Sequence, residues 1–108
     1  MADERALTLC RELARRVRDA RLPVDGLILF GSAARGDMHE WSDIDAIALV
    51  SDAVRQDEIR DVRRAVYLIA TELDSRFEIV AIPSLRFEQD ESTPLLEVVR
   101  AEGVRIAA

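Results

Sequence analysis

Short apolar runs, separated by segments with helical spacing, constrain the fold of this chain most strongly. Leu27–Phe30 reads L-I-L-F, and Ile44–Val50 reads I-D-A-I-A-L-V with one acid in apolar company. Phe77–Ile82 reads F-E-I-V-A-I and ends at Pro83. Runs of this length, bounded by residues such as Gly31 and Pro83, are typical of buried strands. The sequence therefore predicts three strands.

The segments around these runs carry the apolar spacing of helices. A first helix presents one apolar face and ends near Pro23 and Gly26; the face comprises Ala6, Cys10, Leu13, Val17 and Ala20. A long helix over about 54–74 repeats the pattern with Ile59, Val62, Val66, Ile69 and Leu73. Thr93-Pro94 opens a last helix that ends at Gly103, and 104–106 could form a short edge strand. This alternation predicts an α/β layer structure, with the strand directions left open.

Composition narrows the class of protein. The 108 residues are enough for one domain, so we expect a single domain over 1–108. A net charge of −6 argues against a general nucleic-acid binder. All 15 basic residues are Arg, and the absence of Lys excludes a Walker-type phosphate loop. Cys10 is the only cysteine, which excludes an internal disulfide. With no signal-peptide pattern and no membrane-length apolar run, we expect a soluble cytoplasmic protein without membrane contacts.

Two aspartates are the first candidate functional residues. Side chains alternate along a strand, so Asp43 and Asp45 project to one face while Ile44 enters the core. Two unpaired carboxylates about 7 Å apart repel each other, and a hard divalent cation would compensate them. The alternative is a pair that is solvated or bridged by an arginine such as Arg35.

Two further elements accompany the aspartates. Gly31-Ser32 follows the first strand, where a glycine and the free N–H groups of a helix start can hold a phosphate, although a simple turn with a helix cap has the same pattern. Glu78 lies between Phe77 and Ile79, where a charge is costly unless it is exposed, paired or metal-bound. If Glu78 shares a face with the aspartates, three acids converge as two-metal nucleotidyl transfer requires. A solubility charge on an edge strand is the alternative.

The motif G-S-x10-D-x-D, formed by Gly31-Ser32 and Asp43-x-Asp45, resembles the signature of the DNA polymerase beta-like nucleotidyltransferase superfamily. The string G-S-A-A-R-G-D-M-H-E-W-S-D-I-D and the ending L-L-E-V-V-R-A-E-G-V-R-I are similar to the minimal nucleotidyltransferases of prokaryotes, which are commonly encoded beside HEPN-domain proteins. The resemblance covers essentially the whole chain. It implies the nucleotidyltransferase fold, a small mixed sheet of three to four strands flanked by helices.

The resemblance also implies roles for individual residues. Gly31 and Ser32 would hold the β- and γ-phosphates of ATP, and Asp43 and Asp45 would bind two Mg²⁺ ions. Glu78 would fill the third carboxylate position, where the family usually has Asp. The additional methylene moves the carboxylate outward and puts the metal geometry in question. Arg35 matches the family's arginine after G-S-x-A and would contact phosphate or pair with an acid of the motif.

The function that the resemblance implies is that of an antitoxin. Minimal nucleotidyltransferases of this kind transfer AMP from ATP to a tyrosine of a HEPN ribonuclease toxin. Because the chain is nearly all catalytic core, we expect the acceptor hydroxyl to come from another protein. Two alternatives are a binding-only antitoxin whose catalysis Glu78 has degraded, and a small-molecule nucleotidyltransferase, similar to aminoglycoside-modifying enzymes, that a homodimer completes.

Other conspicuous residues have simpler interpretations. We expect His39 to face solvent and Trp41 to cover the loop against the core, although its indole could stack on a base. Tyr67 lies beside the apolar stripe of the long helix and could face a partner. The arginine-rich face of the first helix is expected to be solvated, although it could dock an acidic partner.

Overall fold

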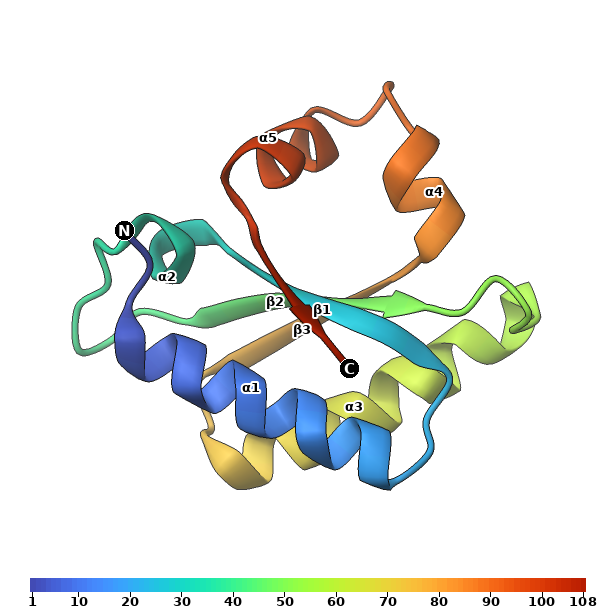
Figure 1. The fold of residues 1–108 in the computed structure, drawn as a ribbon, viewed down its shortest axis with the longest axis horizontal. Coiled ribbons are helices and arrows are strands. Elements are labelled where there is room, and N and C mark those ends of the chain that lie inside the picture. Colours follow the sequence, from blue (N-terminus) through green and yellow to red (C-terminus); the bar gives the residue numbers. More distant parts are fainter.

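The computed structural model describes residues 1–108 as a four-stranded sheet with helices on both faces. Figure 1 shows α1 and α3 below the sheet and α4 and α5 above it. The elements in chain order are α1 (Glu4–Asp19), β1 (Val24–Phe30), α2 (Gly31–Arg35), β2 (Ile44–Val50), the 3-10 turn η1 (Gln56–Glu58), α3 (Ile59–Leu73), β3 (Phe77–Pro83), α4 (Ser84–Gln89), α5 (Pro94–Glu102) and β4 (Val104–Ala107).

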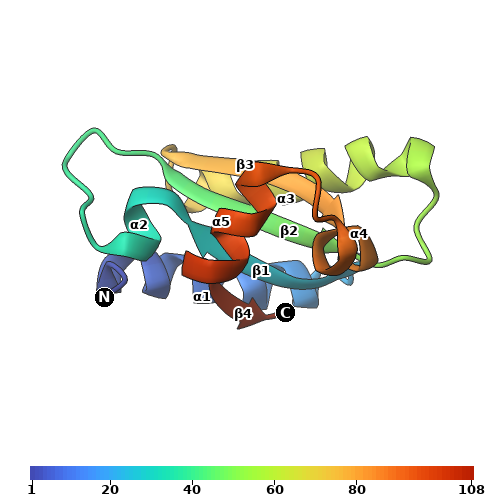
Figure 2. The same cartoon turned by 90° about the horizontal axis from the view of Figure 1, so that it is seen from above.

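The sheet is mixed and has the order β3-β2-β1-β4. β1 is antiparallel to both β2 and β4, whereas β2 and β3 are parallel and are joined by the crossover helix α3. Figure 2 shows β3 along one side of the sheet and β4 along the other. These features confirm the predicted α/β class and the small mixed sheet of three to four strands.

Side-chain alternation along β2 divides the core into two layers. Ile44, Ala46 and Ala48 face α1 and α3 in the larger apolar cluster, which includes Leu13 and Val66. The opposite face forms a smaller cluster with α4 and α5; its members are Ile28, Ile47, Leu49, Ile82, Phe87, Leu96 and Val99. β2 is therefore buried on both faces, which explains its nearly continuous apolar sequence.

Several predicted boundaries differ from the structure. The first strand begins at Val24, so Gly26 lies inside β1 and not in the turn after the first helix. A glycine suits this position because an added Cβ would make a tight contact, 3.1 Å, with the carbonyl oxygen of Ile106 on β4. Ala20 is exposed at the end of α1, and Ala14 is buried in its place. The helix expected from residue 54 begins with the turn η1, and its α-helical part starts at Ile59.

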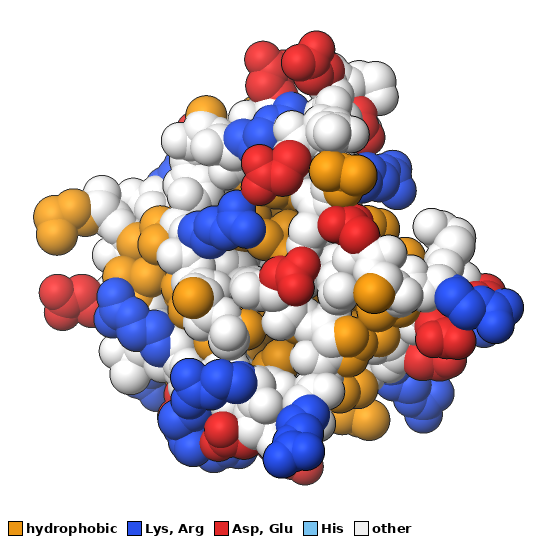
Figure 3. All heavy atoms as spheres, turned by 45° about the vertical axis from the view of Figure 1, so that its right-hand side comes forward, with side chains coloured by type: hydrophobic (Ala, Val, Ile, Leu, Met, Phe, Trp, Pro, Cys, Tyr) orange, Lys and Arg blue, Asp and Glu red, His pale blue; other side chains and the backbone are white.

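The surface carries charges of both signs. Figure 3 shows acidic and basic side chains interspersed with apolar ones, with acidic side chains at the top of the view over the connection between α4 and α5. Asp90 and Glu91 belong to this connection. None of the helices has both the length and the apolar character needed to cross a membrane.

The reactivity of Cys10 can be used to test how α1 packs against the sheet. The Cys10 side chain is completely buried, and burial raises the pKa of its thiol to about 12. Because the thiolate is the reactive form, we expect Cys10 to resist alkylation by a thiol reagent at pH 8 in the folded protein and to react fully in urea. Rapid reaction without denaturant would contradict the packing of α1, and the single cysteine makes the readout unambiguous.

Candidate active site

The sheet register brings two of the candidate acids together. Asp45 of β2 is the direct partner of Glu78 on the parallel strand β3, and its partner on the other side is Phe30 of β1. Directly paired residues of neighbouring strands project from the same face of a sheet, with backbones about 4.8 Å apart. Asp43 lies just before β2, two residues from Asp45. The structure thus places Asp43, Asp45 and Glu78 in one acidic neighbourhood.

The electrostatics of Asp45 reflect this arrangement. Its side chain is partly buried, whereas Asp43 and Glu78 are exposed. Burial is the largest cause of the raised pKa of Asp45, and the negative charges of Asp43 and Glu78 raise this pKa further. The positive charge of Arg35 acts in the opposite direction. The charged form of Asp45 therefore lacks full compensation from the protein.

The residues present fit a divalent metal in their chemistry. Carboxylate oxygens are the preferred ligands of Mg²⁺, and a cation would offset the repulsion that raises the pKa of Asp45. The three carboxylates are not gathered into a ready-made cluster of metal ligands. Asp43 and Glu78 are exposed, which leaves their side chains room to rotate toward a cation.

Gly31 has a steric reason to be a glycine. It starts α2 with a φ of +68°, in the left-handed region that disfavours other residues. A Cβ added at Gly31 would also lie 2.6 Å from Oδ2 of Asp45. The turn after β1 thus passes directly over the Asp45 carboxylate, and Ser32 follows it. The two halves of the sequence motif meet at this point.

Arg35 lies at the end of α2 and connects it to two other segments. Its Nε donates to Asp37 at 3.2 Å, and its Nη1 is 3.9 Å from a carboxylate oxygen of Glu102 on α5. Asp37 belongs to the loop between the motif halves, so Arg35 pairs with an acid of that loop and not with Asp43 or Asp45. Sequence reasoning missed Glu102 because an ion pair between α2 and α5 has no local signal.

A small pocket adjoins Gly31 between α2 and α5. It has a volume of about 160 Å³, and Phe30, Leu95 and Val98 contribute its apolar lining. Leu95 and Val98 remain about half exposed. Pockets for drug-sized ligands usually measure roughly 300–1,000 Å³, so this one is too small to enclose a large acceptor molecule.

The loop before β2 exposes an aromatic side chain. Trp41 is 82% exposed, so the expectation that it covers the loop against the core is wrong. The loop is held instead by polar contacts, in which the Ser42 hydroxyl accepts from the His39 N–H at 3.0 Å. His39 faces solvent as expected, and its Nδ1 accepts from the Trp41 N–H at 3.4 Å. These contacts satisfy backbone donors that no strand partner reaches.

The fold and the acidic site together define a nucleotidyltransferase. The family model described as "Nucleotidyltransferase domain" matches residues 10–100, and the chain belongs to this family. The match includes Gly31, Ser32, Asp43, Asp45 and Glu78.

Particular relatives agree with this assignment. The chain is 30% identical over 83 residues to a Methanocaldococcus jannaschii protein named "Putative protein adenylyltransferase MJ0141", covering 77% of this chain and 79% of that protein. A crystal structure of a "putative nucleotidyltransferase" from Sulfolobus solfataricus has a TM-score of 0.61 at 18% identity and shares the fold, over 94% of this chain and 78% of that one. A toxin–antitoxin structure with AMP-PNP has a TM-score of 0.58 at 26% identity, over 87% of this chain and 68% of that chain.

The contact between Gly31 and Asp45 can be tested by a double-mutant cycle. We expect Gly31→Ala to lower the free energy of unfolding by about 1–3 kcal/mol, because the added Cβ meets both an unfavourable φ and the Asp45 carboxylate. Asp45→Ala should relieve part of this cost, so the two changes should be non-additive by at least about 0.5 kcal/mol. Urea denaturation of the four proteins measures the cycle, and strict additivity would contradict the close contact.

The raised pKa of Asp45 predicts how stability depends on pH. The folded state holds the Asp45 proton more tightly than the unfolded chain, whose ordinary pKa is 3.8, so this stabilisation is present below pH 3.8 and is lost as the pH rises through the folded pKa. In metal-free buffer we expect Asp45→Asn to be more stable than the wild type at pH 7, with a smaller difference at pH 3.

Asp90 provides a control of opposite sign. Hydrogen bonds from Ser92 and Thr93 lower its pKa to about 2, so its stabilisation is present above the ordinary value and is lost as the pH falls. Asp90→Asn should therefore be less stable than the wild type at pH 7. If both variants shift stability in the same direction, the electrostatic account of Asp45 is wrong.

Proposed function

We propose that residues 1–108 form one minimal nucleotidyltransferase unit that acts in the cytoplasm as an antitoxin. It transfers AMP from ATP to a tyrosine hydroxyl of a cognate HEPN toxin. The observation that carries the proposal is the position of Asp45, which lies beside Glu78 in the sheet register and directly under Gly31. A relative named as a protein adenylyltransferase and a similar toxin–antitoxin structure with AMP-PNP support the choice of donor and partner.

The chemistry assigns a task to each group. Asp43, Asp45 and Glu78 would hold two Mg²⁺ ions, which supply positive charge to the triphosphate and lower the pKa of the attacking hydroxyl. Gly31 lets the backbone approach the phosphates, and Ser32 offers a hydroxyl hydrogen bond to them. The acceptor oxygen forms a bond to the α-phosphorus and gives its proton to the solvent that reaches this exposed site. The bond between the α-phosphorus and the oxygen bridging to the β-phosphate breaks, and diphosphate leaves.

The size of the pocket beside Gly31 supports an acceptor carried by another protein. The pocket beside Gly31, of about 160 Å³, leaves no room for a large small-molecule acceptor. A tyrosine presented on a protein surface needs only an open approach to the acids. Asp43 and Glu78 provide it because both are exposed.

A second candidate function is binding without catalysis. The observation that favours it is Glu78, which stands where the family usually has Asp. In this case the chain would neutralise a toxin by covering its surface, and the acidic site would play no chemical part. Both functions require a protein partner, and they differ only in whether AMP is transferred.

Co-expression with the proposed cognate HEPN protein tests the proposal. We expect the partner, weighed intact, to gain the mass of AMP beside the wild-type chain, and Asp43→Ala to lower this modification roughly 100-fold or more because a metal ligand is lost. Neutralisation by Asp43→Ala equal to that by the wild type, with no AMP on the partner in either case, would establish the binding-only function.

Glu78 can be tested separately within the same assay. Glu78→Gln keeps the size of the side chain but removes its charge, so AMP transfer should fall strongly, whereas Glu78→Asp should retain activity. Glu72→Gln is the matched control, since Glu72 is an exposed glutamate on α3 outside the acidic site. Full activity of Glu78→Gln would show that Glu78 binds no metal.

A further inference from the structure

The acidic site opens at one edge of the sheet. β3 is the last strand in the order β3-β2-β1-β4, so one of its edges pairs with no other strand. Glu78 lies on this strand, and Val80, two residues further on, is 39% exposed. A partner that presents a hydroxyl to Glu78 can therefore contact this edge and the helix beside it.

Helix α3 covers part of the free edge with one long side chain. Nε of Arg63 donates to the carbonyl oxygen of Ile79 at 2.8 Å, next to Glu78 in the chain. The same guanidinium lies 5.6 Å from the ring centroid of Tyr67. The exposed face of α3 is thus continuous with the strand that carries the third acid.

This face of α3 forms a groove of about 510 Å³, which we call the α3 groove. Its lining consists of Arg60, Asp61, Arg63, Arg64, Tyr67 and Leu68. Tyr67 is 37% exposed and Leu68 is 53% exposed. The groove combines three arginines and one acid, a net positive charge, with an aromatic and an aliphatic side chain. Tyrosine and arginine are enriched at the energetic centres of protein interfaces.

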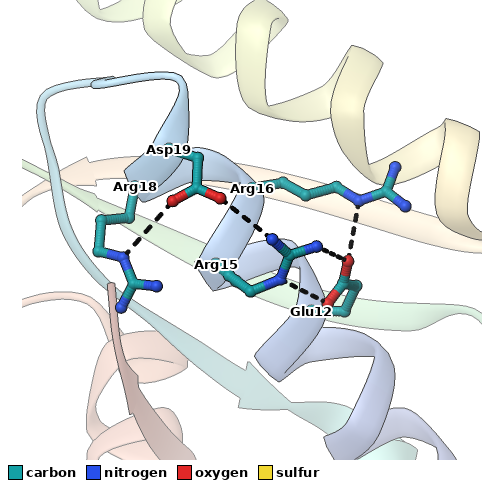
Figure 4. A network of polar contacts seen from close by, with 5 residues as sticks. All are labelled: Glu12, Arg15, Arg16, Arg18 and Asp19. Carbon is teal, nitrogen blue, oxygen red and sulfur yellow. Dashed lines mark hydrogen bonds and ion pairs between the residues drawn. The ribbon is translucent and has the colours of Figure 1, made fainter.

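The arginines of the α3 groove differ in their pairing from three of the five arginines of α1, whereas Arg5 and Arg11 of α1 also form no ion pair. Figure 4 shows that Arg15, Arg16 and Arg18 are bound to Glu12 and Asp19 along α1 itself. Arg60, Arg63 and Arg64 take part in none of the ion pairs of the structure; those pairs involve other arginines. In a chain of net charge −6, this is a local concentration of unpaired positive charge.

We propose that the α3 groove is the docking surface for the acceptor protein, and that it receives an acidic segment of that partner with an apolar side chain against Tyr67 and Leu68. The inference rests on the proposed function for the identity of the partner. Opposite charges guide the encounter and set its register, and the apolar contact adds affinity. Docking here holds the partner against the edge of β3; because Glu78 projects from the face of the sheet opposite α3, the partner reaches Glu78 across this edge.

A protein fits this surface better than a nucleic acid. Binding to a phosphate backbone needs an extended basic face, whereas the groove has three arginines in a chain of net charge −6. The exposed aliphatic Leu68 also offers nothing to a phosphate backbone. The acidic site beyond the edge of β3 would repel nucleic acid further.

The test is the double charge reversal Arg60→Glu/Arg64→Glu in the full chain. Both residues are exposed, and neither forms an ion pair, so the fold should survive, as circular dichroism can check. The matched control, Arg5→Glu/Arg11→Glu, makes the same charge change at exposed positions on α1. The probe is the purified HEPN protein of the proposed function, and its dissociation constant for the chain is measured at low and high salt.

We expect the α3 reversal to weaken binding by about tenfold or more at low salt and by less at high salt, with the α1 control close to wild type. Binding of Mg-ATP, measured without the partner, should not change. Equal partner affinity for wild type and reversal, or no binding by the wild type, would overturn the docking surface. So would a reversal that abolishes binding of single-stranded RNA but leaves partner affinity intact.

The same data separate this inference from the proposed function. If the reversal weakens partner binding but the wild type transfers no AMP, the docking surface stands and adenylylation falls. If the wild type transfers AMP and the reversal does so with unchanged affinity, adenylylation stands and the docking surface falls. Leu68→Ala, which removes only the apolar contact, should also weaken binding, with little dependence on salt.

Discussion

The position of Asp45 in the sheet is the constraint on which the site depends. β2 is held between β1 and β3, so its register fixes Asp45 opposite both Phe30 and Glu78. A slip of one residue would turn Asp45 into the core and break both apolar layers, because side chains alternate between faces. The hydrophobic core therefore enforces a repulsive arrangement of carboxylates that would not arise by itself. Gly31 completes it, since only a residue without Cβ can pass over that carboxylate.

The carboxylates around Asp45 lower the stability of the fold at neutral pH, although metal binding would use the same carboxylates. Burial and neighbouring acids raise the pKa of Asp45, so the ionised site costs the fold stability at neutral pH. A divalent cation would recover that energy, and metal affinity and folding stability are two aspects of the same electrostatic imbalance. Strain of this kind persists only where the surrounding structure determines it, as the buried strands do around Asp45.

Sequence reasoning could predict what depends on local pattern. Ile44–Val50 was recognisable as a strand because an apolar run of that length, interrupted by a single acid, fits little else. α4 was not expected, since a helix of six residues that buries only Phe87 has no periodicity to detect. The strand order, and with it the pairing of Asp45 with Glu78, could not be derived because it follows from long-range packing. Trp41 shows the same limit, since a large aromatic residue is usually buried and only the tertiary structure leaves it in solvent.

The acids lie at one side of the sheet, close to its free edge. β3 is an edge strand, and an unpaired edge is usually a liability that proteins cover or charge. Here Arg63 donates a hydrogen bond to the Ile79 carbonyl on that edge, and Glu78 places a charge on one face of β3. Both features discourage another strand from pairing there. Under the proposed function, the same two residues would still admit a partner that approaches through side chains, so protection against aggregation and access to the acids would have one structural origin.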